Sequence, residues 1–84
     1  MATVGERLKR VIVAWLGVNE HDVVPEASFL EDLDADSLDL LDLMMAIEDE
    51  FSIDISPDDM EQLETVQEAK DYIEKQLQSR QNME

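Results

Sequence analysis

Residues 36–51, which read DSLDLLDLMMAIEDEF, decide the fold of this chain. Their apolar side chains recur at intervals of three and four, which is the spacing of one helix face. Asp36 stands just before this period begins and Asp39 follows three residues later, so Asp36 is placed to cap a helix. The pattern predicts a helix over 37–51 with a core-facing stripe made of Leu40, Leu43, Met44, Ile47 and Phe51.

This helix carries more apolar surface than one small core can cover. Leu38, Leu41 and Met45 follow the same spacing on a second face. The acids interleaved with them are Asp39, Asp42, Glu48 and Asp49. An apolar strip edged with acids suits an amphipathic partner with a basic rim. The alternative is a broad core that wraps the helix, but we interpret the second face as a partner surface.

Capping signals place three further helices. T-x-x-E capping boxes occur at 3–6 and 65–68, and Ser56 precedes a proline at a first helical position. Gly17 can end the first helix in a left-handed cap. The helices expected from these signals cover 4–16, 57–62 and 66–77. The core stripe expected of the first is Val4, Leu8, Val11, Ile12, Trp15 and Leu16.

The elements add up to an all-α fold, a four-helix bundle with three longer helices and one short helix. A long loop, 18–36, joins the first two helices, and Val23, Phe29 and Leu33 should pin it to the core. We interpret Ile53 and Ile55 as loop anchors, although a tiny strand is the alternative. The length of the chain predicts one domain over 1–84, and its polar last residues predict a frayed tail over 78–84.

The charge is extreme, because 22 acidic residues face 6 basic ones and give a net charge of −16. No lysine or arginine occurs between Val11 and Ala69. Such a surface argues against nucleic acid and anionic membranes, and favours partners with positive patches. Solubility alone is the simpler explanation of the charge. No signal peptide or membrane-spanning run is visible, so we expect a monomeric cytoplasmic protein.

Ser37 is the residue with the most chemical interest, and it opens the predicted helix at 37–51. The chain has no cysteine, and nothing places its one histidine, His21, near Ser37 as a base. Catalysis by Ser37 is therefore not expected, because a serine nucleophile needs a base within hydrogen-bond reach. Two interpretations remain from the residues alone: Ser37 helps to cap the helix, or it is an attachment point modified by another enzyme.

A metal site is not expected. Residues 32–36 give D-x-D-x-D, the start of a calcium loop. The glycine required at the sixth position is Ser37, and the glutamate required at the twelfth is Leu43. Weak binding of magnesium or calcium to the acidic faces remains the only metal interaction we expect.

The stretch 29–39, FLEDLDADSLD, resembles the attachment motif of acyl carrier proteins of dissociated, type II fatty acid synthesis. The runs 45–51 and 65–73 also resemble that family, so the similarity covers about residues 4–77. The resemblance implies a carrier, not an enzyme, with 4′-phosphopantetheine on Ser37, installed from coenzyme A by a phosphopantetheinyl transferase. Asp36 would assist the attachment. The arm would supply the thiol that the sequence lacks.

The resemblance also implies partners and cargo. Fatty acid synthase and acyl-transferring enzymes with basic patches would read the helix at 37–51, and the bundle would shelter part of the acyl chain. The implied partner-binding residues are Leu38, Asp39, Leu41, Asp42, Met45, Glu48 and Asp49. Two departures from the family pattern, Asp34 in place of glycine and Leu40 in place of a smaller residue, suggest a specialised carrier for a polyketide or lipid pathway. An unmodified acidic interaction protein is a further alternative.

Overall fold

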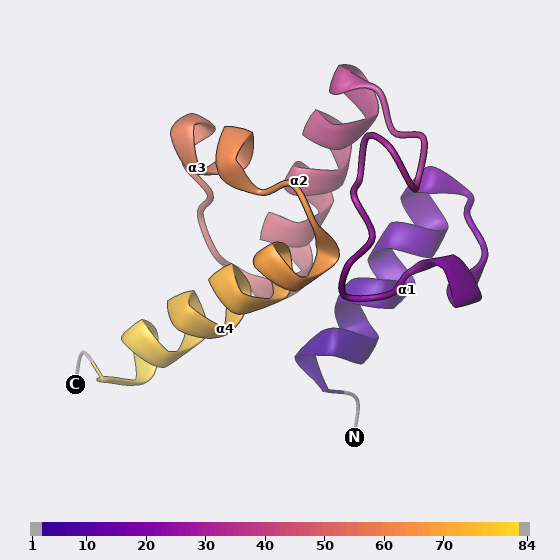
Figure 1. Cartoon of the computed structure of the whole chain (residues 1–84). Coiled ribbons are helices and arrows are strands. Elements are labelled where there is room, and N and C mark those ends of the chain that lie inside the picture. Colours follow the sequence, from indigo (N-terminus) through magenta and orange to yellow (C-terminus); the bar gives the residue numbers. More distant parts are fainter. Residues whose placement is uncertain (1–2, 83–84) are drawn as a thin grey trace.

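The computed structural model describes residues 3–82, and the described residues form four α-helices and one short 3-10 helix (Figure 1). The elements are α1 (Val4–Leu16), η1 (Glu20–Asp22), α2 (Ser37–Phe51), α3 (Pro57–Gln62) and α4 (Val66–Asn82). The all-α fold, with three longer helices and one short one, is confirmed, and so is the start of every helix. The long loop between α1 and α2 is also confirmed, although η1 interrupts it.

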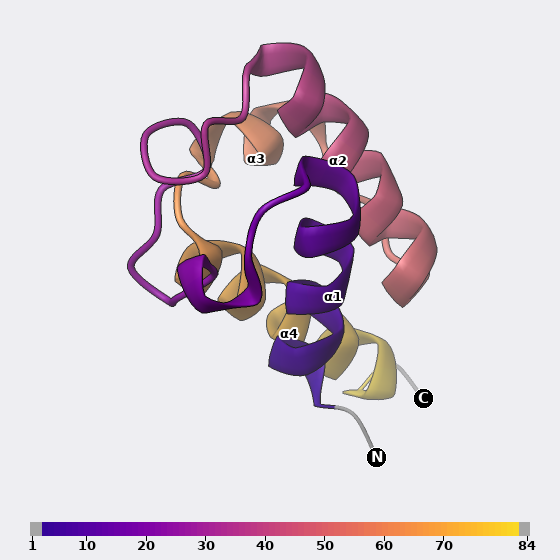
Figure 2. The ribbon, with the colours of Figure 1, turned by 90° about the vertical axis from the view of Figure 1, so that its right-hand side faces the viewer.

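The first two helices lie side by side and run in opposite directions, while α4 crosses below them (Figures 1 and 2). The short α3 sits at the end of the molecule where α2 begins (Figure 2). This arrangement leaves one long side of α2 without a neighbouring helix. That side of α2 is therefore an outer surface of the bundle.

Side-chain caps explain why the helices begin where they do. The Thr3 hydroxyl accepts a hydrogen bond from the Glu6 N–H at 3.1 Å, and the Glu6 carboxylate reaches back to the Thr3 N–H. Thr65 and Glu68 form the same reciprocal box at the start of α4, while the Ser56 hydroxyl caps α3 by accepting a hydrogen bond from the Asp59 N–H. At the other end of α1, Gly17 has φ +65° and ends the helix in the left-handed conformation that glycine tolerates.

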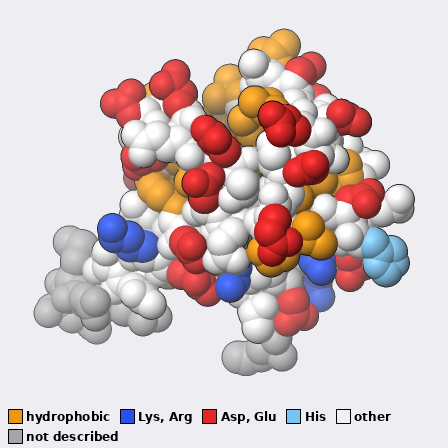
Figure 3. Space-filling model, in the orientation of Figure 1, with side chains coloured by type: hydrophobic (Ala, Val, Ile, Leu, Met, Phe, Trp, Pro, Cys, Tyr) orange, Lys and Arg blue, Asp and Glu red, His pale blue; other side chains and the backbone are white. Residues whose placement is uncertain are grey.

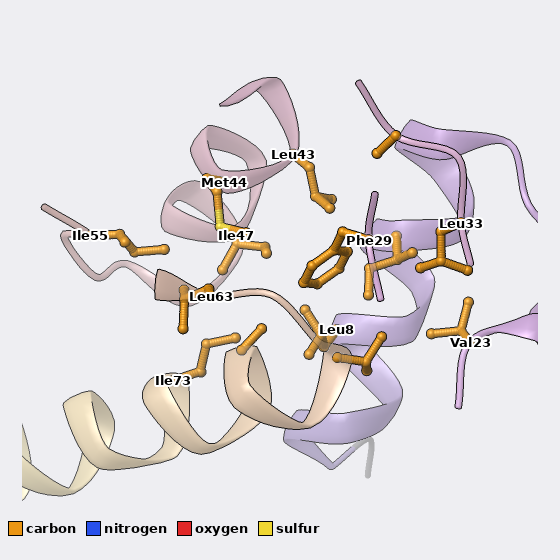
Figure 4. Packing of buried hydrophobic residues seen from close by; sticks show 14 of the residues in the cluster. Leu8, Val23, Phe29, Leu33, Leu43, Met44, Ile47, Ile55, Leu63 and Ile73 are labelled. Carbon is orange, nitrogen blue, oxygen red and sulfur yellow. The ribbon is translucent and has the colours of Figure 1, made fainter. Parts of the chain in front are cut away.

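The core lies where the long loop enters between the helices. Phe29 is fully buried and lies between Leu8 of α1 and Leu43 and Ile47 of α2 (Figure 4). Its backbone N–H also donates to the Glu64 carbonyl at 3.0 Å, which ties the loop to the start of α4. The other expected anchors are buried too, as predicted: Val23, Leu33, Ile53 and Ile55.

Two polar contacts hold the helices against one another. The Arg7 guanidinium donates to the Glu50 carboxylate at 2.9 Å and to the Glu50 carbonyl at 2.6 Å, and lies 4.5 Å from the centre of the Phe51 ring. The Tyr72 hydroxyl donates to the Asp59 carboxylate at 2.7 Å. The first contact joins α1 to the end of α2, and the second joins α3 to α4.

The structure corrects two expectations. Trp15 was expected in the core but is 57% exposed, because the buried stripe of α1 follows Leu8 and Ile12 and leaves Trp15 at its edge. The last helix was expected to end near Leu77 but continues to Asn82. Residues 78–82 contain neither proline nor glycine to stop it. Residues 83–84 lie outside the described part of the chain.

Candidate attachment site and docking surface

Ser37 is the first residue of α2 and is exposed, but it does not cap the helix. Asp36 performs that task, since its carboxylate accepts a hydrogen bond from the Asp39 N–H at 2.8 Å. The Asp39 carboxylate lies 3.5 Å from the Asp36 N–H and completes the capping box. Among the described residues, the Ser37 hydroxyl has no hydrogen-bond partner. The hydroxyl can therefore be modified without breaking the cap of α2.

The turn before Ser37 is set by a residue in an unusual conformation. Asp34 has φ +55°, in the left-handed region that favours glycine. Next to it, Ala35 is buried and its N–H donates to the Phe29 carbonyl at 2.9 Å. The left-handed turn at Asp34 thus lies between two buried residues, Leu33 and Ala35, just before the chain reaches the exposed Ser37. It also explains physically why glycine would suit this position, as the family pattern suggests.

Two of the acids near Ser37 accept hydrogen bonds from the backbone and do not converge on a metal site. The Asp32 carboxylate turns back to accept the Ser28 N–H at 2.7 Å, and Asp36 is occupied as a cap. Within residues 3–82, no group of three or more histidine, cysteine or acidic side chains converges to hold a metal ion. His21 lies exposed in η1 and is not hydrogen-bonded to Ser37. No described side chain is therefore placed as a base for Ser37.

The structure brings the expected apolar residues together on the outer side of α2. Leu38 is 74% exposed, Leu41 48% and Met45 54%, so the core does not wrap this face of α2, and its use as a partner surface stays a prediction. Asp39, Asp42 and Asp49 are exposed beside them. We call these six residues the docking surface. Exposed large side chains on one helix face are a feature of surfaces that bind a partner.

Glu48 differs from the other acids expected on this surface. It is half-buried, and its carboxylate accepts a hydrogen bond from the Ile55 N–H at 2.7 Å. This contact closes the turn between α2 and α3. The sequence pattern did not show this, because Glu48 has the same helical spacing as an exposed acid but lies toward α3.

The charges are distributed unevenly over the molecule (Figure 3). Acidic side chains cover α2 and α3, whereas lysine and arginine side chains gather over α1 and α4. Hydrophobic side chains are visible over the beginning of α2, among the acids. The end of the molecule that carries Ser37 is thus strongly negative. A positively charged partner would be steered toward it.

A hollow of about 380 Å³ opens directly beside Ser37. Apolar side chains dominate its walls, and they come from the long loop, α2 and α3: Leu30, Leu40, Leu41, Met44, Pro57 and Met60. Sequence reasoning missed Leu30, Pro57 and Met60 as part of the site. One signal was present, because Met60 is the one large apolar residue in PDDMEQ, the polar sequence of α3.

These features fit a phosphate ester on Ser37 with an apolar tail. The exposed Ser37 hydroxyl can form an ester, and the hollow offers apolar walls within reach. A free hydroxyl at the start of an acidic helix, with an apolar hollow beside it, is an arrangement that suits a covalent carrier domain. Comparison with models of known protein families agrees with this class. The phosphopantetheine attachment site family matches residues 6–73, and the chain belongs to this family.

The family's cofactor is 4′-phosphopantetheine, held covalently. When bound, it supplies a thiol at the end of a long arm, a group that the chain, which has no cysteine, does not contain. No helix in the described part of the chain is long and apolar enough to cross a membrane.

Proposed function

We propose that this chain is an acyl carrier protein that bears 4′-phosphopantetheine on Ser37 and presents acyl thioesters to partner enzymes. The observation that carries the proposal is that capping and attachment fall to different residues at the start of α2. Asp36 makes the capping hydrogen bond, which leaves the exposed Ser37 hydroxyl free. Family membership supplies the cofactor, and the local geometry favours Ser37 as its attachment point.

The attachment reaction requires a second protein. A bond forms between the Ser37 oxygen and the phosphorus of the pantetheine half of coenzyme A. The bridging P–O bond of the diphosphate breaks, and the adenosine bisphosphate leaves. The serine proton goes to a base on the transferase, because no described residue of this chain is placed to take it. Asp36, adjacent to Ser37, would assist by drawing the transferase's metal ion toward the site, using the carboxylate oxygen that does not cap α2.

Partner enzymes would bind the docking surface by two contributions. Leu38, Leu41 and Met45 offer apolar area, and Asp39, Asp42 and Asp49 attract basic side chains at the rim. Such contacts give fast, salt-sensitive association. Glu48 contributes to the negative field, but its carboxylate is already bound to the Ile55 N–H. We therefore assign Glu48 a structural part as well as a partner-binding part.

The pathway we favour is fatty acid biosynthesis, with a cytoplasmic, monomeric, non-enzymatic carrier. The apolar hollow beside Ser37 suits an alkyl chain better than a polar cargo. The second candidate is a specialised polyketide or lipid carrier. The observation that favours it is the pair Asp34 and Leu40, because one adds a negative charge before Ser37 and the other narrows the hollow.

The attachment proposal is tested by intact mass. The chain is incubated with coenzyme A, magnesium and a broad-specificity phosphopantetheinyl transferase. We expect a gain of one phosphopantetheine in the wild type and in Ser79→Ala, an exposed serine on α4, but none in Ser37→Ala. Modification of Ser37→Ala would place the arm elsewhere. No gain in a folded, unmodified wild type would return the chain to an acidic interaction protein.

The docking proposal is tested by charge reversal. Asp42→Lys should lower kcat/KM of the transferase at least about fivefold at low salt, equivalent to about 1 kcal/mol. Asp22→Lys, which makes the same change at an exposed acid of η1, should have little effect. Both variants should unfold at the wild-type denaturant concentration. If kcat/KM fell equally in the two variants, the effect would come from net charge, and the proposal that partners bind the docking surface would be wrong.

A further inference from the structure

A second hollow adjoins the one beside Ser37. It measures about 370 Å³, close to the 380 Å³ of the first, and its walls include the buried Phe29 and Leu63 as well as the exposed Glu31 and Glu64. Four residues line both hollows: Leu30, Leu40, Met60 and Glu61. Side chains that line two adjoining spaces form the boundary between them. Ser37 and Leu41 line only the first hollow, and Leu63 lines only the second.

Leu40 and Met60 are the two half-buried residues of the boundary, one from α2 and one from α3. Leu40 stands on α2, one turn after Ser37, and is half-buried against the core. Met60 stands on α3 and is also half-buried against the core. Leu30 comes from the loop and is 54% exposed, and Glu61 is exposed, so neither can close the inner side of the hollow. The inner boundary therefore depends on Leu40 and Met60.

The two residues differ in how easily they move. Leu40 is held by a long helix, and its backbone N–H donates to the Asp36 carbonyl at 2.9 Å in the first turn of α2. Met60 has an unbranched, flexible side chain and belongs to a helix of six residues. That helix is tied to α4 through the hydrogen bond between Tyr72 and Asp59, the residue before Met60. Met60 is thus the adjustable side of the boundary.

We propose that Leu40 and Met60 form a partition that limits the length of acyl chain sheltered by this carrier. The inference rests on the proposed function, because it concerns the cargo of the arm on Ser37. The first hollow accepts the early part of a chain that leads inward from the arm. Carbons beyond the partition stay in water, while removal of either side chain joins the two hollows into one longer space.

The length of acyl chain that the protein shelters can be measured through the stability of the fold. Each methylene group that leaves water on folding favours the folded state by up to about fourfold. Methylene groups that remain in solvent add nothing. In the wild type, the equilibrium constant for folding should rise with chain length and then level off. The length at which it levels off measures how deep the cargo can enter.

The experiment loads the chain with amide-linked acyl phosphopantetheine analogues, which resist hydrolysis, from hexanoyl to tetradecanoyl. Intact mass confirms loading, and urea unfolding gives the folding constant for each length. We expect the levelling point to move at least two methylene groups longer in Met60→Ala and in Leu40→Ala. The matched control is Leu16→Ala, because Leu16 is also half-buried against the core but lines neither hollow, so the levelling point should stay unchanged.

The outcomes separate the partition from the function. Loading without a change in the levelling point overturns the partition and leaves the carrier function standing. Loading without any stabilisation, at any length, shows that the hollow takes no cargo and also overturns the partition. Failure to load the folded wild type overturns the proposed function itself. If Leu40→Ala does not fold, Met60→Ala decides the test, since Met60 lies on the short α3 and not on a core helix.

Discussion

The hydrogen bond from Tyr72 to Asp59 makes an unusually direct test of how α3 is held. Tyr72 is the only tyrosine in the chain, so its ionisation can be followed without interference from another phenol. Burial of the ring, together with the bond to the Asp59 carboxylate, raises the pKa of Tyr72 from 10.0 to about 12. Below pH 10 the phenol is neutral in both the folded and the unfolded chain, and Tyr72 adds no pH dependence.

The sign of the effect follows from which state loses the proton first. Between pH 10 and about pH 12, the unfolded phenol ionises while the folded one keeps its proton. Unfolding then releases a proton, so stability falls as pH rises through this window. The difference in pKa corresponds to at most about 2.7 kcal/mol. Because the Tyr72 ring is partly exposed, we expect solvent screening to reduce the loss to about 1–2 kcal/mol.

Two measurements check this reasoning. Tyrosinate absorbance, titrated in the folded protein and in urea, should give a higher pKa in the folded protein. Urea unfolding at a series of alkaline pH values should show the loss of stability in the wild type. The loss should be smaller in Tyr72→Phe, which has no phenol to ionise. The loss that remains in Tyr72→Phe measures the effect of lysine titration. Asp59→Asn should return the folded pKa part of the way toward 10.0. A folded Tyr72 that titrates near pH 10 would refute the contact and, with it, the anchoring of α3.

Three further substitutions, the first with a matched control, test other parts of the structure by urea unfolding. Arg7→Met should lower the free energy of unfolding by about 1–2 kcal/mol through loss of the contacts to Glu50 and Phe51, which water partly screens, and Arg10→Met should leave it unchanged. Asp34→Gly should raise it by up to about 1 kcal/mol by relieving the left-handed backbone, and a loss instead would show that the aspartate side chain holds the turn. Trp15→Gln should change it by less than about 0.5 kcal/mol, whereas a buried tryptophan would cost several kcal/mol.

The helix starts could be predicted from sequence because their determinants are local. A capping residue and its partner lie within three positions of each other, so Thr3, Asp36, Ser56 and Thr65 reveal their helices without knowledge of the fold. Helix ends without such a signal could not be predicted as well. The last helix passes Leu77 because nothing in the polar sequence that follows opposes it.

The limits of periodicity explain the errors at the site. Helical spacing shows which residues share a face, but it does not show where a neighbouring element stops. Trp15 shares the apolar spacing of α1 yet lies at the edge of the core, and Glu48 shares the acidic spacing of α2 yet turns toward Ile55. The hollow beside Ser37 needed three elements distant in sequence, so no local pattern could reveal it.

Leu41 connects the two roles that we propose for α2, partner binding and cargo shelter. It is 48% exposed on the docking surface, and it also lines the hollow beside Ser37. A partner that buries Leu41 therefore covers one wall of the space in which we place the cargo. Leu38 and Met45 belong to the docking surface but do not line that hollow, so partner contact and cargo contact meet at one side chain. Leu41→Ala should weaken partner binding and acyl-chain stabilisation together, whereas Met45→Ala should weaken only partner binding. Measurements of partner affinity and of the folding constants of acyl-loaded chains would compare the two variants. If both variants reduced acyl-chain stabilisation equally, Leu41 would not be the one side chain shared by partner and cargo.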